Sequence, residues 1–235
     1  MENITYQYQF DFKNERKETF RIELDSITLQ PVKPYPASLP EWTRLEFNIC
    51  ADCPLPKENT FCPLAAQLAP LVDTLHDVTS IEETLVTVTM DERTESRKTT
   101  AQEGISSFMG VITAVSGCPL TAFFKPMARF HLPFSNMEET FYRAASMYML
   151  GQYYRWQNEL SADMDMKGLV QFYNNVAKVN KGMADRLRAN QREDSAVNAL
   201  VLLDMFVKSV PDAIDDLLDE LKPLFTAYLE QPHIT

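Results

Sequence analysis

The sequence predicts an α+β fold, with a small antiparallel sheet at the N-terminus followed by a bundle of about five helices. Up to residue 98, several segments carry an apolar residue at every second position, which is typical of strands with one buried face. From Thr100 onward the apolar spacing changes to three and four, which is typical of amphipathic helices. With 235 residues, 45% of them hydrophobic, the chain is long enough to build such a core.

The alternation predicts a first strand over residues 4–12 and a second over 20–24, joined as a hairpin by a polar turn. It also predicts strands over 43–49 and 85–90, and the charged segment 91–98 is expected to pair with the latter. Repeated prolines make residues 31–40 an extended connection, because proline lacks the N–H that pairing needs.

Helix starts are marked by capping signals. Cys62 followed by Pro63 predicts a helix through Leu75, which Pro70 either kinks or breaks into two turns. Thr100-x-x-Glu103 and Ser135-x-x-Glu138 have the capping-box pattern. The remaining predicted helices are a short one after Cys118–Pro119 and longer ones over 169–187, 197–206 and 211–225.

The sequence divides into residues 1–98, a β region with a cysteine loop and one helix, and residues 99–235, a helical bundle. Because no linker rich in glycine or serine separates them, we expect the two regions to pack as a single body.

The formal net charge of −11 argues against sequence-independent binding to nucleic acid or to an anionic membrane, since both need many cations. No long apolar run and no signal-peptide pattern are present, so we expect a soluble cytoplasmic protein. Residues 178–192 are rich in Lys and Arg, and residues 193–220 are rich in Asp and Glu. Such segments are either neighbouring solvated helix faces that attract one another or a docking surface for an anionic partner.

Four cysteines form the most distinctive motif. Cys50, Cys53 and Cys62 follow the spacing C-x2-C-x8-C, and Cys118 repeats the Cys-Pro-Leu sequence of Cys53 and Cys62. A cysteine pair separated by two residues places two sulfurs on one side of a turn, which predicts a metal site formed by all four cysteines. Zinc is the first candidate and an iron–sulfur cluster the alternative, because both accept four thiolates. His131 is a candidate substitute ligand.

Two other interpretations of the cysteines stay open: reactive redox thiols, or small apolar residues of the core. Cys62 and Cys118 are predicted at helix N-termini, where the helix dipole favours thiolate over thiol. None of the common nucleotide-binding, hydrolase or metalloprotease motifs occurs, so the sequence leaves open whether the protein is an enzyme.

The motifs Cys53-Pro54-Leu55, Cys62-Pro63-Leu64, Gly117-Cys118-Pro119 and the segment 125–134, Lys-Pro-Met-Ala-Arg-Phe-His-Leu-Pro-Phe, carry a resemblance. From about residue 45 to 155, the chain resembles an uncharacterised family of bacterial proteins described as a domain of unknown function. The resemblance implies that the cysteines act together and supplies no activity, cofactor or catalytic residue.

These observations lead to two functional hypotheses. The first is a cytoplasmic bacterial protein in which a metal held by the four cysteines stabilises an interaction or regulatory module that binds another protein. The alternative is a redox protein, either an iron–sulfur carrier or sensor or a thiol oxidoreductase that uses Cys50 and Cys53. A third hypothesis is an enzyme with its site near Arg129 and His131.

Overall fold

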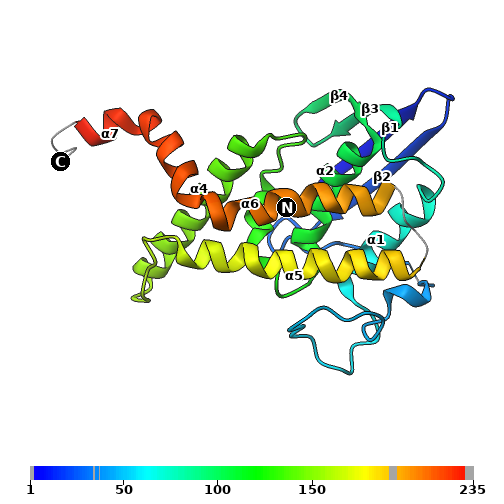
Figure 1. The fold of residues 1–235 in the computed structure, drawn as a ribbon, viewed down its shortest axis with the longest axis horizontal. Helices are drawn as coiled ribbons and strands as arrows, with labels where there is room; N and C mark the ends of the chain where they lie inside the picture. The colour runs from blue at the N-terminus through cyan, green and yellow to red at the C-terminus, as the bar shows by residue number, and fades with distance from the viewer. Residues whose placement is uncertain (1–2, 34, 37, 191–194, 231–235) are drawn as a thin grey trace.

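The computed structural model describes residues 3–33, 35–36, 38–190 and 195–230. Within these ranges an N-terminal antiparallel sheet lies at one end of the molecule, and the helices pack beside it and extend away from it (Figure 1). The predicted α+β fold is confirmed.

The sheet has four strands in the order β2-β1-β3-β4. They are β1 (Ile4–Phe12), β2 (Lys17–Leu24), β3 (Glu83–Thr89) and β4 (Thr94–Thr100), and every neighbouring pair is antiparallel. Tyr8 in the central β1 stands opposite Phe20 of β2 and Val88 of β3. The burial of β1 alternates along its whole length, as the sequence pattern predicts, and the charged segment after β3 pairs with it as β4.

β4 continues directly into α2 (Ala101–Val115), because Thr100 is both the last residue of the strand and the N-cap of the helix. The predicted capping box between Thr100 and Glu103 is confirmed. Gly104 allows α2 to approach the sheet, since a Cβ at this position would lie 2.7 Å from side-chain atoms of Phe10 and Val86. The helix is therefore fixed against the sheet from its first turn.

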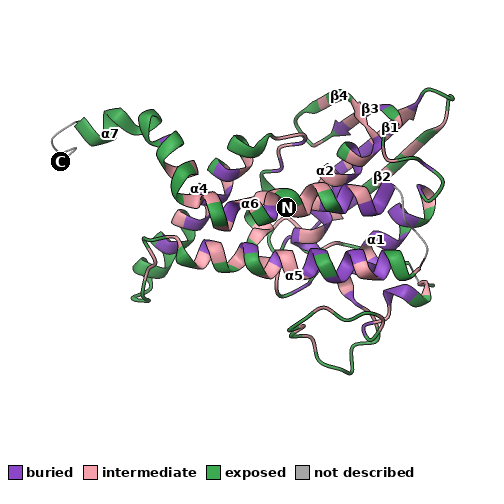
Figure 2. Ribbon diagram, viewed as in Figure 1, coloured by how far each residue is buried: buried purple, intermediate pink, exposed green. Residues whose placement is uncertain are grey.

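The other helices are α1 (Pro63–Thr74), α3 (Lys125–Arg129), α4 (Met137–Gln157), α5 (Lys167–Ala189), α6 (Ser195–Leu221) and α7 (Thr226–Glu230). Short 3-10 segments cover Glu41–Thr43, Ala122–Phe124 and Lys222–Phe225. α5 and α6 run side by side along the molecule, and α2 lies between α6 and the sheet (Figure 1). The end of α6 and α7 project from the body and are largely exposed (Figure 2).

Two clusters of buried apolar side chains hold the fold together. The larger, here called the sheet core, joins β1, β2, β3, α1 and α2 to the C-terminal half of α5 and the start of α6; it includes Tyr8, Phe10, Leu64, Ile105 and Leu187. The smaller, here called the helical core, joins α4 to the first half of α5 and the second half of α6; it includes Phe141, Tyr148, Leu169, Tyr173 and Val210. α5 and α6 thus contribute to both clusters.

The predicted strand over residues 43–49 is wrong. This segment begins in the 3-10 turn Glu41–Thr43 and continues as turns, with only an isolated bridge from Arg44 to Phe61. The central strand β1 is already paired on both edges. The backbone carbonyls of Trp42, Arg44 and Leu45 instead accept hydrogen bonds from the buried guanidinium of Arg186 in α5.

Three helix predictions also need correction. The helices predicted over 197–206 and 211–225 are mainly one helix, α6, which continues through Pro211 and is anchored by Val207, Val210 and Leu221 in the helical core. The capping box of α4 lies one residue later than predicted, at Asn136 and Glu139. Of the two effects expected of Pro70, the break into two turns is wrong, because α1 continues through Pro70 as one helix.

The predicted boundary after residue 98 falls within β4, and the packing of the two regions as one body stays a prediction.

The basic segment 178–192 lies largely on α5, and the acidic segment 193–220 lies largely on α6. The ion pairs that the described residues of these helices form are not between the two helices. Lys181 pairs with Asp185 within α5, Lys208 pairs with Asp204 within α6, and Lys178 pairs with Asp52.

Candidate functional site: a cavity between the two cores

A cavity of about 500 Å³ lies where the sheet core meets the helical core. Its walls come from the continuous segment formed by the end of β4 and α2, the segment 121–137, α4, α5 and α6. Most of its lining surface is apolar, and both cores contribute to it: Val111, Ala114, Ala128 and Leu203 come from the sheet core, and Val176, Phe206 and Val207 from the helical core. Phe124 packs against both clusters.

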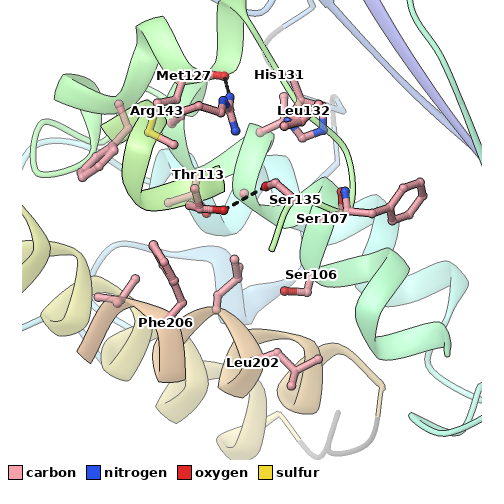
Figure 3. A pocket seen from close by; sticks show the side chains of 18 of the residues that line it. Ser106, Ser107, Thr113, Met127, His131, Leu132, Ser135, Arg143, Leu202 and Phe206 are labelled. Carbon is pink, nitrogen blue, oxygen red and sulfur yellow. Dashed lines mark hydrogen bonds between the residues drawn. The ribbon is translucent and has the colours of Figure 1, made fainter. Parts of the chain in front are cut away.

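Figure 3 shows how the walls face one another. Met127, His131 and Arg143 lie on one side, Leu202 and Phe206 project from α6 on the opposite side, and Ser106 and Thr113 belong to the α2 wall. The hydroxyl of Thr121 donates to the carbonyl of Thr113 over 2.6 Å, which ties the segment after α2 back onto that helix.

Arg143 of α4 brings a positive charge to the cavity wall. One nitrogen of its guanidinium donates to the carbonyls of Met127 (2.8 Å) and Phe130 (2.7 Å), which fixes the side chain beside α3. Burial lowers the pKa of Arg143, and the nearby Arg93 adds to this effect. Within the described part of the chain, no carboxylate forms an ion pair with Arg143.

His131 is buried in the wall between the sheet and the cavity. Its Nε2 shares a hydrogen bond of 2.5 Å with the hydroxyl of Tyr8, which also hydrogen-bonds Ser107 at 2.8 Å. Burial lowers the pKa of His131 to about 3, and the positive charges of Arg143 and Arg93 contribute. The imidazole is therefore neutral at physiological pH.

The α5 wall contributes Tyr173 and Asn180, which lie two helical turns apart on one face. Tyr173 is buried, and its pKa is raised by burial while the charge of Arg143 opposes the rise, so the two side chains are neighbours. Asn180 is only 3% exposed, and its Nδ2 has no hydrogen-bond partner. An unpaired buried amide is unfavourable by roughly 1–3 kcal/mol, which makes it a notable feature of a cavity wall.

The four cysteines gather in a second place, outside the cavity. Cys50 and Cys53 lie in the loop before α1, Cys62 is the N-cap of α1, and Cys118 follows the end of α2. Gly182 of α5 faces this loop so closely that a Cβ would lie 2.5 Å from the sulfur of Cys50. All four are free thiols.

The thiols lie near enough to influence one another's ionisation. Burial raises the pKa of Cys50 to about 11, and Cys62, Cys118 and Cys53 add to the rise. Burial also raises the pKa of Cys118, with contributions from Cys62 and Cys53. Cys62 is the N-cap of α1, as predicted. Cys118 caps no helix, because a turn follows it and the N-cap of the next helical segment is Thr121. The helix-terminal position expected to favour a thiolate at Cys118 is therefore not formed.

Arg186 lies beside this thiol cluster. It is 1% exposed, it donates to three backbone carbonyls, and its charge partly offsets the rise in the pKa of Cys50. It forms no ion pair with a carboxylate in the described ranges. A positive charge in this position favours a cluster that carries negative charge.

Four thiols are the ligands that zinc or an iron–sulfur cluster requires, but the side chains are not arranged to bind either one. In the part of the chain that the structure describes, no three His, Cys, Asp or Glu side chains are positioned to hold a metal ion. The metal at Cys50, Cys53, Cys62 and Cys118, with His131 as substitute, therefore stays a prediction. His131 itself is engaged with Tyr8.

Sequence reasoning missed the cavity. Of the residues singled out from the sequence as candidate site residues, only His131 lines it, whereas Arg129 is exposed and lies outside the lining. The one sequence feature that coincides with the cavity is the segment 125–134, which was noted for its resemblance and which forms part of one wall. The contributions of Arg143, Tyr173 and Asn180 depend on how distant helices pack.

No helix among the described residues combines the length and apolar character needed to cross a membrane.

Comparison with known proteins gives one result. The chain matches none of the curated proteins and none of the solved structures against which it was compared. Residues 4–226 match the profile of the domain of unknown function DUF6901, a longer stretch than the one that carries the resemblance in the sequence. The chain therefore belongs to the family defined by DUF6901, a domain of unknown function.

Proposed function

We propose that this protein binds a small, largely apolar molecule in the cavity between its two cores. The observation that carries the proposal is the cavity itself, with a volume of about 500 Å³ and walls from five separate parts of the chain. Ligand sites commonly have volumes of roughly 300–1,000 Å³, apolar walls and a few polar groups. This cavity has both apolar walls and a few polar groups.

The test is titration with N-phenyl-1-naphthylamine, an uncharged probe whose fluorescence rises in apolar surroundings. Gly110→Leu is the blocking variant, because Gly110 lines the cavity and a Cβ there would meet only Leu203, at 3.9 Å. The matched control is Gly151→Leu on α4, where a Cβ would meet nothing within 4 Å. Circular dichroism checks that both variants fold.

We expect saturable binding to the wild-type protein and to Gly151→Leu, with the affinity of Gly110→Leu reduced by about tenfold or more, a change equivalent to roughly 1.4 kcal/mol. Equal binding by the folded Gly110→Leu protein would exclude the cavity as the site. An absence of saturable binding to the wild type would contradict the proposal.

The thiol cluster supports a second candidate, a metal-stabilised interaction or regulatory module. Its support is the gathering of four free thiols beside the buried charge of Arg186. Zinc is the first metal to test and an iron–sulfur cluster the alternative. The thiol oxidoreductase that uses Cys50 and Cys53 stays a prediction.

Elemental analysis of protein purified without oxygen and without a metal-binding tag tests this candidate. About one zinc per chain, lost in both Cys53→Ser and Cys118→Ser together with a large drop in melting temperature, is the expected result. Iron with sulfide would favour the cluster. Protein that takes up neither metal on reconstitution would return the cysteines to a packing role.

A protein partner for the helical region is part of the same candidate. Its support is a group of exposed aromatic side chains at the end of α4, Tyr153, Tyr154 and Trp156. Exposed aromatic residues are enriched at interfaces, so these positions are the first to change in a search for a partner.

A further inference from the structure

The chemistry of the cavity wall also indicates which ligands it selects, and this step rests on the function proposed above. Many of the polar groups in the lining are already used inside the protein. Ser107 is hydrogen-bonded to Tyr8, Thr121 donates to the backbone, and Ser135 pairs with Thr140. The carboxylate of Glu103 belongs to the capping box of α2.

Three of the groups that remain, on Arg143, Tyr173 and Asn180, are hydrogen-bond donors. Arg143 uses one guanidinium nitrogen for the carbonyls of Met127 and Phe130, and its charge has no ion-pair partner among the described residues. The Nδ2 of Asn180 is buried without any acceptor. Tyr173 also lines the cavity, near enough to Arg143 for the charge of the guanidinium to act on it, and its hydroxyl adds a further donor.

The charge of the lining is also unbalanced. Arg97 and Arg143 face the cavity against the single carboxylate of Glu103, and hydrogen bonds from Thr99 and Thr100 hold the pKa of Glu103 below its usual value. A half-buried arginine without a carboxylate, as Arg143 is here, favours an anion that can accept its hydrogen bonds. The apolar walls around it favour a ligand whose remaining surface is hydrocarbon.

We infer that the cavity selects an amphiphilic organic anion, a carboxylate carried on an apolar chain, with the carboxylate at Arg143 and Tyr173 and the chain between α2 and α6. Leu202, Leu203 and Phe206 line the α6 side, and Val111 and Ala114 the α2 side. The unpaired amide of Asn180 gives a second donor to the same space. An uncharged molecule of the same shape would leave Arg143 without a counter-charge.

The test is displacement of bound N-phenyl-1-naphthylamine by three ten-carbon compounds, decanoate, decan-1-ol and decylamine. Wild-type protein should prefer decanoate over both others by about tenfold or more. Arg143→Met should remove most of this preference, and Asn180→Leu, which disturbs no hydrogen bond that the structure shows for the Nδ2 group, should reduce it. The control is Arg129→Met, which deletes the same charge from an exposed position outside the cavity lining.

The outcomes separate the two proposals. If the probe binds and all three compounds displace it equally, the cavity binds apolar molecules and the inference of an anion is wrong. A preference for decylamine, or a preference for decanoate that survives in the folded Arg143→Met and Asn180→Leu proteins, also overturns the inference. If the probe does not bind to the wild type, the proposed function itself fails.

Discussion

The sheet core and the helical core differ in how completely they are closed. The sheet core is enclosed by strands on one side and helices on the other, and Tyr8, Phe10 and Ile105 have no exposed surface. The helical core is built from helices alone, and Ile214, Leu217 and Leu218 at its far end are only partly buried. Figure 2 shows this as a change from buried to exposed residues along α6. The cavity lies at the junction of the two cores, which indicates that the closed core fixes one wall and the open core leaves room at the other.

The largest effect expected from a single substitution is at Arg186, which ties α5 to the 42–45 segment at the edge of the sheet core. Arg186→Met should lower the free energy of unfolding by about 3–5 kcal/mol, because three buried carbonyls lose their donor. Urea denaturation measures this. Arg188→Met is the control, since Arg188 is exposed and only weakly paired with Asp185; it should change stability by less than about 0.5 kcal/mol. Similar effects for both arginines would show that the buried hydrogen bonds contribute little.

A matched pair of truncations compares the cores directly. Ile105 of the sheet core and Leu169 of the helical core are both fully buried, and each change to alanine should lower the free energy of unfolding by about 2–5 kcal/mol. Because α5 and α6 belong to both cores, we expect one transition in each variant. Far-UV circular dichroism and Trp42 fluorescence in a Trp156→Phe background measure it. If Leu169→Ala separates the two signals, the cores unfold independently.

Two glycines contrast a closed site with an open one. A methyl group at Gly182 would lie 2.5 Å from the sulfur of Cys50 and 3.1 Å from its Cα, so the loop must move. Gly182→Ala should destabilise the protein by about 1–3 kcal/mol. Gly151→Ala meets open space on α4 and should stabilise it by up to about 1 kcal/mol, the difference in helix propensity. Thermal denaturation compares them; a stabilising Gly182→Ala would contradict the close packing of α5 on the cysteine loop.

His131 provides a pH test of the wall between the sheet core and the cavity. Its pKa is about 3 in the folded protein and about 6.5 when unfolded. The contribution of neutral His131 to the free energy of unfolding is therefore fully present above pH 6.5 and is lost progressively as the pH falls toward 3. Between pH 7 and 5 this loss amounts to about 2 kcal/mol. Denaturation at several pH values should show that His131→Gln reduces this pH dependence. The control is His76→Gln, which replaces an exposed histidine outside this wall.

The sheet was largely predictable because its information is local. Alternation along residues 4–12 and the capping pair Thr100 and Glu103 each lie within one element, and both were identified from the sequence. The segment 43–49 has the same alternation but forms no strand, because the guanidinium of Arg186, more than a hundred residues later, takes its carbonyls. Local pattern cannot reveal that competition.

The cavity was not predictable for a related reason. Arg143, Tyr173 and Asn180 have no motif around them, and each resembles an ordinary residue of an amphipathic helix. Their meeting with α2 depends on how α4, α5 and α6 pack. The cysteines had the opposite property: their spacing indicated a group, and the structure brings that group together, but spacing does not determine the distances between sulfurs that a metal requires.

The absence of a loop between β4 and α2 has a consequence for how the family can vary in length. One residue inserted after Thr100 would rotate α2 by about 100° relative to the sheet, since the helix has 3.6 residues per turn. Gly104 would then no longer face Phe10 and Val86, and the residues that line the cavity would turn away from it. We therefore expect relatives to keep a fixed number of residues from the start of β4 to the end of α2.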